Sequence, residues 1–328
     1  GVFLFNSKTG KPVKHLIVPG RKVVDYNSCF VDRNNGIWLA TSNGVFVIDP
    51  LQQIITTHQL MPGDSPPQSQ RGSVFAISER KDNSPSPVAW VHSYMDGIVK
   101  ADLLKDKFQE SPSALNKIFP SHYYCVVKII DDFPIHYILT LSDGLYIFDE
   151  RKNTVKHSGQ GISKINYRMN GPTQDMFVDS RNKLWVATLQ GVVRYDAAAD
   201  TFHHFSMSNE TVAPYVIKIK EDSKGNIWVL RVSNSKLSSG ISMINVSTGK
   251  RINYVTPLIL SHSLGSGKAL SDMWIDKNDK IYLAGTSGLI RVTINSDKAE
   301  SEMLKWGNMS LPPINTIVSE NDSMLWLN

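Results

Sequence analysis

The chain has 328 residues, of which 41% are hydrophobic and 20% are charged, and its formal net charge at pH 7 is +5. This composition is ordinary for a globular protein, and the scattered Lys and Arg residues form no basic stripe of the kind that nucleic-acid binders carry. No run reaches the roughly 18–20 continuous apolar residues of a membrane helix, and residues 1–16 lack the pattern of a signal peptide. We therefore expect no nucleic acid among the partners of this chain.

The predicted elements follow one pattern that recurs along the chain. The stretch "DRNNGIWLATSNGVFVID" at 32–49 returns as "DSRNKLWVATLQGVVRYD" at 179–196. In each copy an aromatic residue lies in a short apolar strand, and a glycine several residues later starts another. These pairs are, in chain order, Trp38 and Gly44, Trp90 and Gly97, Tyr137 and Gly144, Trp185 and Gly191, Trp228 and Gly240, and Tyr282 and Gly288. The aromatic residue recurs at intervals of roughly 43–54 residues, the range of propeller blades.

Each copy is expected to contain four short strands. An alternating strand precedes the aromatic one, as in "CFVD", "DMFVD", "VIKIKED" and "DMWID". The turn between them is rich in Asp, Asn, Gly and Lys, because Asp and Asn side chains bond the local backbone and Gly tolerates positive φ. No stretch shows helical periodicity of useful length, so the pattern predicts an all-β fold.

The two ends of the chain complement each other. Residues 313–328 have the pattern of a first strand, a turn and an aromatic strand, and residues 1–16 have the pattern of the two strands that would follow. We therefore predict one domain over residues 1–328, a seven-bladed β-propeller with four antiparallel strands per blade and a closing blade shared by both ends. The blades are expected at approximately 17–60, 61–110, 111–158, 159–207, 208–256, 257–305, and 306–328 with 1–16. Because the pattern starts in mid-blade, we also expect that the chain was cut from a longer polypeptide.

Two copies depart from the pattern. The copy at 71–110 has a longer turn with two prolines, and the copy at 215–254 has an insertion between Trp228 and Gly240. Insertions on one face of a repeat array often carry binding function. Neutral drift of a loop is the other interpretation, and the sequence leaves both open.

Motifs for catalysis or metal binding are absent from the sequence, so we expect no catalytic residue, no metal and no cofactor. Four aspartates recur at the turns, and we interpret them as turn formers, with repeated calcium binding as the weaker alternative. They are Asp32, Asp179, Asp222 and Asp276.

The loops at one face of the predicted propeller carry aromatic, arginine and histidine side chains. Flat rings and planar polar groups suit a sugar or an acidic sugar. The candidate ligand-binding residues on this channel face are Arg71, His92, Tyr94, Tyr123, Arg168, Tyr215, Arg231 and His262.

The stretches "DRNNGIWLATSNGVFVIDP", "DSRNKLWVATLQGVVRYDAAADTFHHF" and "EDSKGNIWVL" resemble the two-component-regulator propeller repeat. The resemblance covers essentially the whole chain, although the copy at 71–110 is degenerate and lacks the Thr of the repeat. It implies the periplasmic sensor region of a hybrid two-component system, with a second propeller and an immunoglobulin-like domain in the same receptor. It also implies a homodimer, a histidine kinase elsewhere in the receptor, and an oligosaccharide or monosaccharide ligand.

We therefore expect a non-enzymatic sensor propeller that recognises a carbohydrate-derived ligand and passes the signal through a dimer to a membrane-linked histidine kinase. The sequence leaves two other functions open. The first is a scaffold or dimerisation propeller of such a receptor that binds no ligand, and the second, less favoured, is a propeller lyase or glycosidase.

Overall fold

The structure is a computed structural model that describes residues 2–16, 26–32, 35–41, 44–49, 55–58, 74–79, 88–93, 97–102, 107–109, 112–119, 126–140, 144–158, 175–188, 191–206, 215–232, 240–261, 270–295, 298–306, 308–321 and 323–328. Almost all of the regular structure in these ranges is antiparallel β-sheet, so the predicted all-β class is confirmed. Within the same ranges, no helix is long and apolar enough to cross a bilayer.

The chain divides into two compact units. Unit 1 comprises Gly1–Ile17 and Arg168–Asn328. Three of its sheets are formed by four consecutive strands. Their strands are β15 (Met176–Val178), β16 (Leu184–Thr188), β17 (Gly191–Asp196) and β18 (Thr201–Ser206); β19 (Tyr215–Glu221), β20 (Ile227–Val232), β21 (Gly240–Ile244) and β22 (Arg251–Tyr254); and β23 (Leu270–Ile275), β24 (Ile281–Gly285), β25 (Gly288–Asn295) and β26 (Lys298–Met303).

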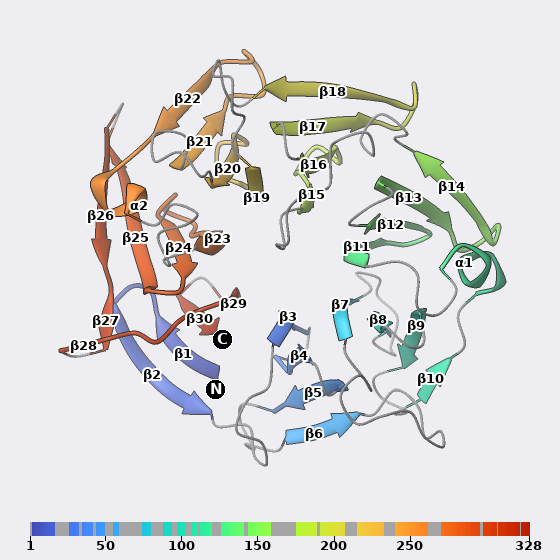
Figure 1. Ribbon diagram of the computed structural model, residues 1–328, viewed down its shortest axis with the longest axis horizontal. Helices are drawn as coiled ribbons and strands as arrows, with labels where there is room; N and C mark the ends of the chain where they lie inside the picture. Colours follow the sequence, from blue (N-terminus) through green and yellow to red (C-terminus); the bar gives the residue numbers. More distant parts are fainter. Residues whose placement is uncertain are drawn as a thin grey trace. The chain divides into compact units, whose positions relative to one another are not determined.

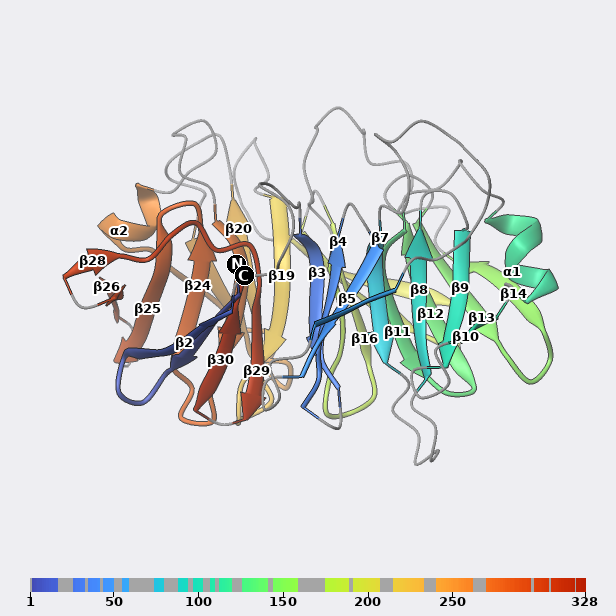
Figure 2. The same ribbon diagram turned by 90° about the horizontal axis from the view of Figure 1, so that it is seen from below.

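Another four-stranded sheet of unit 1 joins the two ends of the sequence, in the order β2-β1-β30-β29. Its strands are β1 (Val2–Asn6), β2 (Lys11–Leu16), β29 (Ile317–Asn321) and β30 (Met324–Leu327). Phe3 of β1 lies opposite Leu327 of β30, and Asn6 lies opposite Met324. Both views place the two ends of the chain next to each other (Figure 1, Figure 2). The sheet that the sequence predicts from both ends is therefore present.

Unit 2 comprises Val18–Tyr167 and has three sheets of four consecutive strands. Neighbouring sheets meet through their first strands, since β3 contacts β7 and β7 contacts β11. The strands are β3 (Tyr26–Val31), β4 (Ile37–Thr41), β5 (Gly44–Ile48) and β6 (Ile55–His58); β7 (Val74–Glu79), β8 (Val88–Ser93), β9 (Gly97–Asp102) and β10 (Lys107–Gln109); and β11 (Val126–Asp132), β12 (Ile135–Thr140), β13 (Gly144–Asp149) and β14 (Thr154–Ser158).

The predicted number of seven blades is wrong. Six blades are formed by consecutive strands, three in each unit, and the other four-stranded sheet is assembled from the two chain ends. The sequence pattern of the two chain ends is that of two half-copies, and counting them as a further blade is why the predicted number was too high.

Two short helices and a hairpin also fall outside the predicted pattern. They are α1 (Ser113–Ile118), α2 (Pro257–Leu260), and the pair β27 (Lys305–Trp306) and β28 (Met309–Ser310). Thr256 caps α2, because its side chain accepts a hydrogen bond from the backbone of Ile259 at 3.2 Å, and Pro257 suits the first helical position. One or two turns are too short to show a helical period in the sequence.

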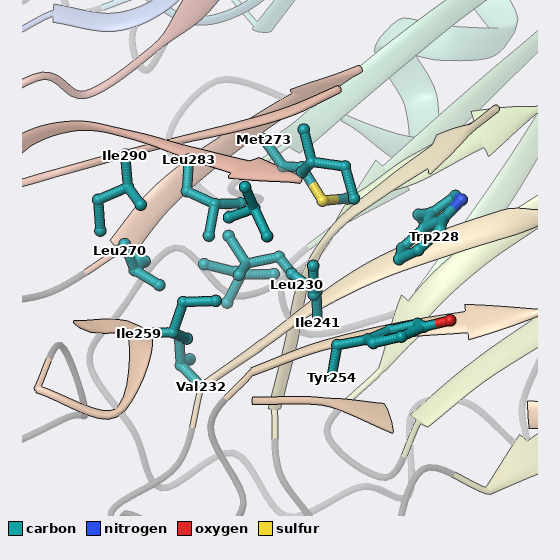
Figure 3. Close-up of a cluster of buried hydrophobic side chains, with 13 residues drawn as sticks. Trp228, Leu230, Val232, Ile241, Tyr254, Ile259, Leu270, Met273, Leu283 and Ile290 are labelled. Carbon is teal, nitrogen blue, oxygen red and sulfur yellow. The ribbon is translucent and has the colours of Figure 1, made fainter. Parts of the chain in front are cut away.

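Apolar side chains fill the space between neighbouring sheets. Figure 3 shows the cluster between the β19–β22 and β23–β26 sheets of unit 1. Trp228 and Leu230 of β20 belong to it together with Met273 and Leu283 of the next sheet. Fully burying one large apolar side chain stabilises a fold by about 1.5–3 kcal/mol. The repeated apolar positions thus hold adjacent blades together.

The four recurrent aspartates are confirmed as turn formers. In each turn one carboxylate oxygen accepts the backbone N–H of the residue four positions later, at 2.7–2.9 Å. In three turns the other oxygen accepts the indole N–H of the tryptophan six positions later. These pairs are Asp32 with Trp38 at 2.6 Å, Asp179 with Trp185 at 2.9 Å, and Asp222 with Trp228 at 2.8 Å. Because these oxygens already hold protein donors, nothing in the described turns favours the calcium alternative.

The repeated glycine starts the third strand of a sheet with positive φ. Gly97 has a φ of 71° and Gly144 a φ of 83°. A Cβ atom added to Gly97 would lie 2.8 Å from the carbonyl oxygen of Phe119, a backbone atom. Both the backbone conformation and the close approach therefore require glycine at this position.

The Gly97→Ala and Gly249→Ala variants separate these two effects. Gly249 also has a φ of 71°, but no atom lies within 4 Å of its added Cβ. Gly249→Ala is expected to lower the free energy of unfolding by about 1 kcal/mol through backbone strain. Gly97→Ala is expected to lower it by about 2–4 kcal/mol, because Phe119 must also move. Urea titrations of both variants measure the difference, and equal losses would contradict the role assigned to Phe119.

Candidate functional site

The structure describes three of the eight predicted ligand-binding residues. His92 lies on β8 in unit 2, whereas Tyr215 on β19 and Arg231 on β20 lie in one sheet of unit 1. Tyr215 and Arg231 lie at the same end of neighbouring strands, but Tyr215 pairs with Val232 and Arg231 with Val216, so their side chains point to opposite faces of the sheet. The other five lie outside the described residues: Arg71, Tyr94, Tyr123, Arg168 and His262.

Arg231 replaces a residue that has a structural role in other sheets. Three positions after the repeated aromatic residue, other copies carry Thr41, Thr140 and Thr188. The hydroxyls of Thr140 and Thr188 each donate a hydrogen bond at 3.0 Å to the carbonyl of the glycine that starts the next strand. Arg231 occupies this position in the β19–β22 sheet and is only 3% exposed. A cation thus stands where the repeat has a hydroxyl.

The residue opposite Arg231 is Gly240, so no side chain covers the backbone at this position. An added Cβ would meet the carbonyl oxygen of Tyr254 at 2.7 Å and Nη2 of Arg231 at 3.3 Å. Tyr215 is half-buried on the neighbouring strand. We call the set Tyr215, Arg231 and Gly240 the Arg231 end; it carries a guanidinium with several N–H donors on one face of the sheet and an aromatic ring on the other.

A second polar set lies on the first strands of unit 1, and the sequence analysis missed it. Asp175, Lys218 and Asp272 each lie four residues before a turn aspartate, in three successive sheets. Asp175 accepts the backbone N–H of Ile219 in the next sheet at 3.0 Å. Asp272 accepts that of Ile317 in its next sheet at 2.8 Å. We call each of these hydrogen bonds from an aspartate to the next sheet an acidic clasp. The repeated strings "DMFVD" and "DMWID" are its signal in the sequence.

Lys218 lies between the two carboxylates. Its Nζ is 3.4 Å from Oδ1 of Asp272, which is 7% exposed in its side chain. Burial alone lowers the pKa of Lys218, but the charges of Asp272 and Asp175 and the hydrogen bond to Asp272 outweigh it and raise the pKa well above 10.5. Lys218 is therefore a permanent cation that balances two acidic clasps.

Metal binding has no further support. Within the described ranges, no group of three or more His, Cys, Asp or Glu side chains is arranged to hold a metal ion. In unit 1, Asp175 and Asp272 instead accept hydrogen bonds from backbone N–H groups, and Asp272 also pairs with Lys218.

Comparisons with known proteins place this geometry in context. No family model and no curated protein sequence matches the chain. Among solved structures, the extracellular domain of the putative hybrid two component system BT4673 from B. thetaiotaomicron is 14% identical, with a TM-score of 0.70 over 95% of the chain. That of BT3049 from the same organism is 19% identical, with a TM-score of 0.59 over 82% of the chain. The chain has the fold of these extracellular domains.

The likeness covers only part of those larger proteins. The chain spans 38% of the BT4673 domain and 34% of the BT3049 domain. A structure of YCF48 bound to D1 peptide is also similar, at 11% identity and a TM-score of 0.60 over 93% of the chain and 91% of that protein. At these identities the comparisons show the fold alone.

Proposed function

We propose that the chain is an extracytoplasmic, periplasmic sensor propeller of a hybrid two-component signalling receptor. One observation carries the proposal: the chain has the fold of extracellular domains of putative hybrid two component systems, and its blade repeats resemble the two-component-regulator repeat. In this role the chain itself catalyses no reaction. It senses a carbohydrate-derived ligand and passes the signal through a homodimer to a membrane-linked histidine kinase.

The Arg231 end supports the ligand class. A guanidinium donates paired hydrogen bonds to a carboxylate or to adjacent hydroxyls, and an aromatic ring offers a face for a sugar ring. Arg231 provides the guanidinium, and Tyr215 provides an aromatic ring at the same end of this sheet, on its other face. In the sequence, the insertion between Trp228 and Gly240 includes Arg231. We propose that an oligosaccharide or monosaccharide, neutral or acidic, binds at this end.

The partners follow from the share of the larger proteins that the chain spans. Since it covers 38% of the BT4673 domain, we propose that its receptor holds further domains beside it, namely a second propeller and an immunoglobulin-like domain. A ligand shifts such a receptor only by binding its two states with different affinity. The β19–β22 blade contacts Asp175 of one neighbouring sheet and Asp272 of the other. It is therefore suited to transmit a shift in that equilibrium to both sheets.

A thermal-shift screen against plant, host and microbial oligosaccharides tests the proposal. A sugar present at 100 times its Kd stabilises the folded state by about 2.7 kcal/mol, which raises Tm by about 5–10 °C. Arg231→Met is expected to abolish this rise. Lys250→Met removes a charge from an exposed turn of the same sheet and is expected to retain it. Tyr215→Leu serves as a second test if Arg231→Met does not melt cooperatively.

Three results would count against parts of the proposal. A rise that Arg231→Met and Tyr215→Leu leave unchanged would place the ligand elsewhere. No rise with any sugar, in a chain that melts cooperatively, would favour a scaffold or dimerisation propeller. Consumption of the oligosaccharide during the assay would favour a lyase or glycosidase.

A further inference from the structure

A buried polar cluster in unit 2 has no part in the proposed ligand site. His136 lies on β12, and its side chain is 1% exposed. Its Nε2 lies 2.9 Å from Oε2 of Glu150, and its Nδ1 lies 3.1 Å from Oδ1 of Asp131. The contact with Asp131 is an ion pair when the ring is protonated. Each ring nitrogen therefore faces a carboxylate oxygen.

This arrangement selects one protonation state of the ring. A neutral imidazole has one N–H, and its other nitrogen presents a lone pair. That lone pair would face a carboxylate, and the side chain of Asp131 is fully buried at 0% exposure. The imidazolium presents an N–H to both carboxylates. The geometry thus favours the protonated ring on both sides.

The cluster also connects two blades. Lys100 on β9 donates a hydrogen bond from Nζ to Oε1 of Glu150, which follows β13, at 2.9 Å. Trp90 on β8 packs edge-on against the His136 ring, with centroids 5.1 Å apart and planes at 60°. The ammonium of Lys100 lies 5.8 Å from the centroid of the Trp90 ring. His136 and Glu150 therefore belong to the β11–β14 blade and contact the β7–β10 blade.

The charges that face the ring also favour its protonated form. In the described part of unit 2, these charged groups include Asp131 from β11, Glu150 after β13 and Lys100 from β9. The imidazolium carries the charge that complements the two carboxylates. A neutral ring lacks that charge beside Asp131, whose side chain is 0% exposed, and this is costly.

We propose that His136 is a proton-dependent clamp between the β7–β10 and β11–β14 blades of unit 2. With the proton bound, the ring joins Asp131 to the Glu150–Lys100 pair and supports the edge contact with Trp90. After the proton is lost, the blades separate more easily. Because the proposal needs no ligand, it stands or falls independently of the proposed function.

The pKa gives the direction of the response. Burial lowers the pKa of His136, but hydrogen bonds and charges from Asp131 and Glu150 outweigh it and hold the pKa above 6.5. A folded-state pKa above the unfolded value means that the stabilisation is fully present below about pH 6.5 and is lost as pH rises through the folded-state pKa. The blades are therefore expected to separate more readily in alkaline than in mildly acidic conditions.

Hydrogen exchange and NMR on the full chain test the clamp. In the wild type, the His136 ring is expected to titrate with a midpoint above 6.5. Protection factors of amides in β9 and β13 are expected to fall as pH rises from about 6.5 to that midpoint, by at most about tenfold per pH unit for one proton, and to level off above it. His136→Gln is expected to remove this pH dependence. His204→Gln, at an exposed position of β18, is expected to keep the wild-type profile.

A second variant keeps the test decisive if His136→Gln does not fold. Glu150→Gln preserves size but removes one facing charge, and it is expected to lower the His136 midpoint by about 1 pH unit. A wild-type midpoint at or below 6.5 would overturn the proposal. A protection profile that is the same in wild type and His136→Gln, or a midpoint unchanged in Glu150→Gln, would also overturn it.

Discussion

Replacing Asp179 by alanine is expected to lower the free energy of unfolding by about 3–5 kcal/mol. Asp179 is 3% exposed, and its carboxylate accepts the backbone N–H groups of Arg181 and Lys183 at 2.9 and 2.8 Å. It also accepts the indole N–H of Trp185 at 2.9 Å. Trp185 is 0% exposed, so water cannot replace the lost acceptor. These three donors, and the guanidinium of Arg181 at 3.4 Å from Oδ2, are left without their charged partner.

Urea titration of Asp179→Ala measures this loss, and Asp196→Ala is the matched control. Asp196 also accepts two backbone N–H groups in a turn, from Ala198 and Ala199 at 3.0 and 3.3 Å. That turn faces solvent, so water can take over the acceptor role, and a clearly smaller loss is expected. Similar losses in both variants would show that burial of the Asp179–Trp185 pair contributes little.

Asp272→Ala is expected to lower the free energy of unfolding by about 3–5 kcal/mol as well, through contacts between sheets. Asp272 is 5% exposed and accepts the backbone N–H groups of Met273 and Ile317, both at 2.8 Å. Its removal also leaves Lys218 without the nearer of its two carboxylates. The β23–β26 sheet then loses a polar clasp on the sheet that contains β29.

Asp272→Asn separates the charge from the hydrogen bonds. The amide oxygen still accepts the N–H of Ile317, but the negative charge beside Lys218 is gone. A loss of about 1–3 kcal/mol is expected from this variant in chemical denaturation. Equal losses for Asp272→Asn and Asp272→Ala would assign the whole effect to the charge, and no loss in Asp272→Asn would assign it to the hydrogen bonds.

The blades were predictable because their signals are local. Trp185 and Gly191 mark two adjacent strands within seven residues, and Asp179 marks the turn before them. Such signals depend on the alternation of a strand and on the conformations that Asp and Gly favour in turns. The grouping of blades into two units was not predictable, because it depends on packing between segments that the repeat treats as equivalent.

The candidate site was predictable only in part. Arg231 and Tyr215 were found because they lie near strand ends, but the burial of Arg231 comes from its neighbours in the folded sheet. The clasp at Asp272 was not predicted although "DMWID" repeats "DMFVD". The last aspartate of each string forms a turn, and the first was not given a role of its own. His136 could not be found from spacing, because Lys100 and Glu150 meet beside it from different blades.

The shared sheet of unit 1 determines when that unit can be completed. The backbone N–H of Ser7 donates to the carbonyl of Ser323 at 2.8 Å, and 316 residues separate the two. Closing a loop of that length costs about 5 kcal/mol of chain entropy, so the contact is expected to form after the intervening blades have ordered their own segments. During synthesis, β1 and β2 emerge before β29 and β30 and must wait for them. These two strands are thus expected to be among the last of unit 1 to fold.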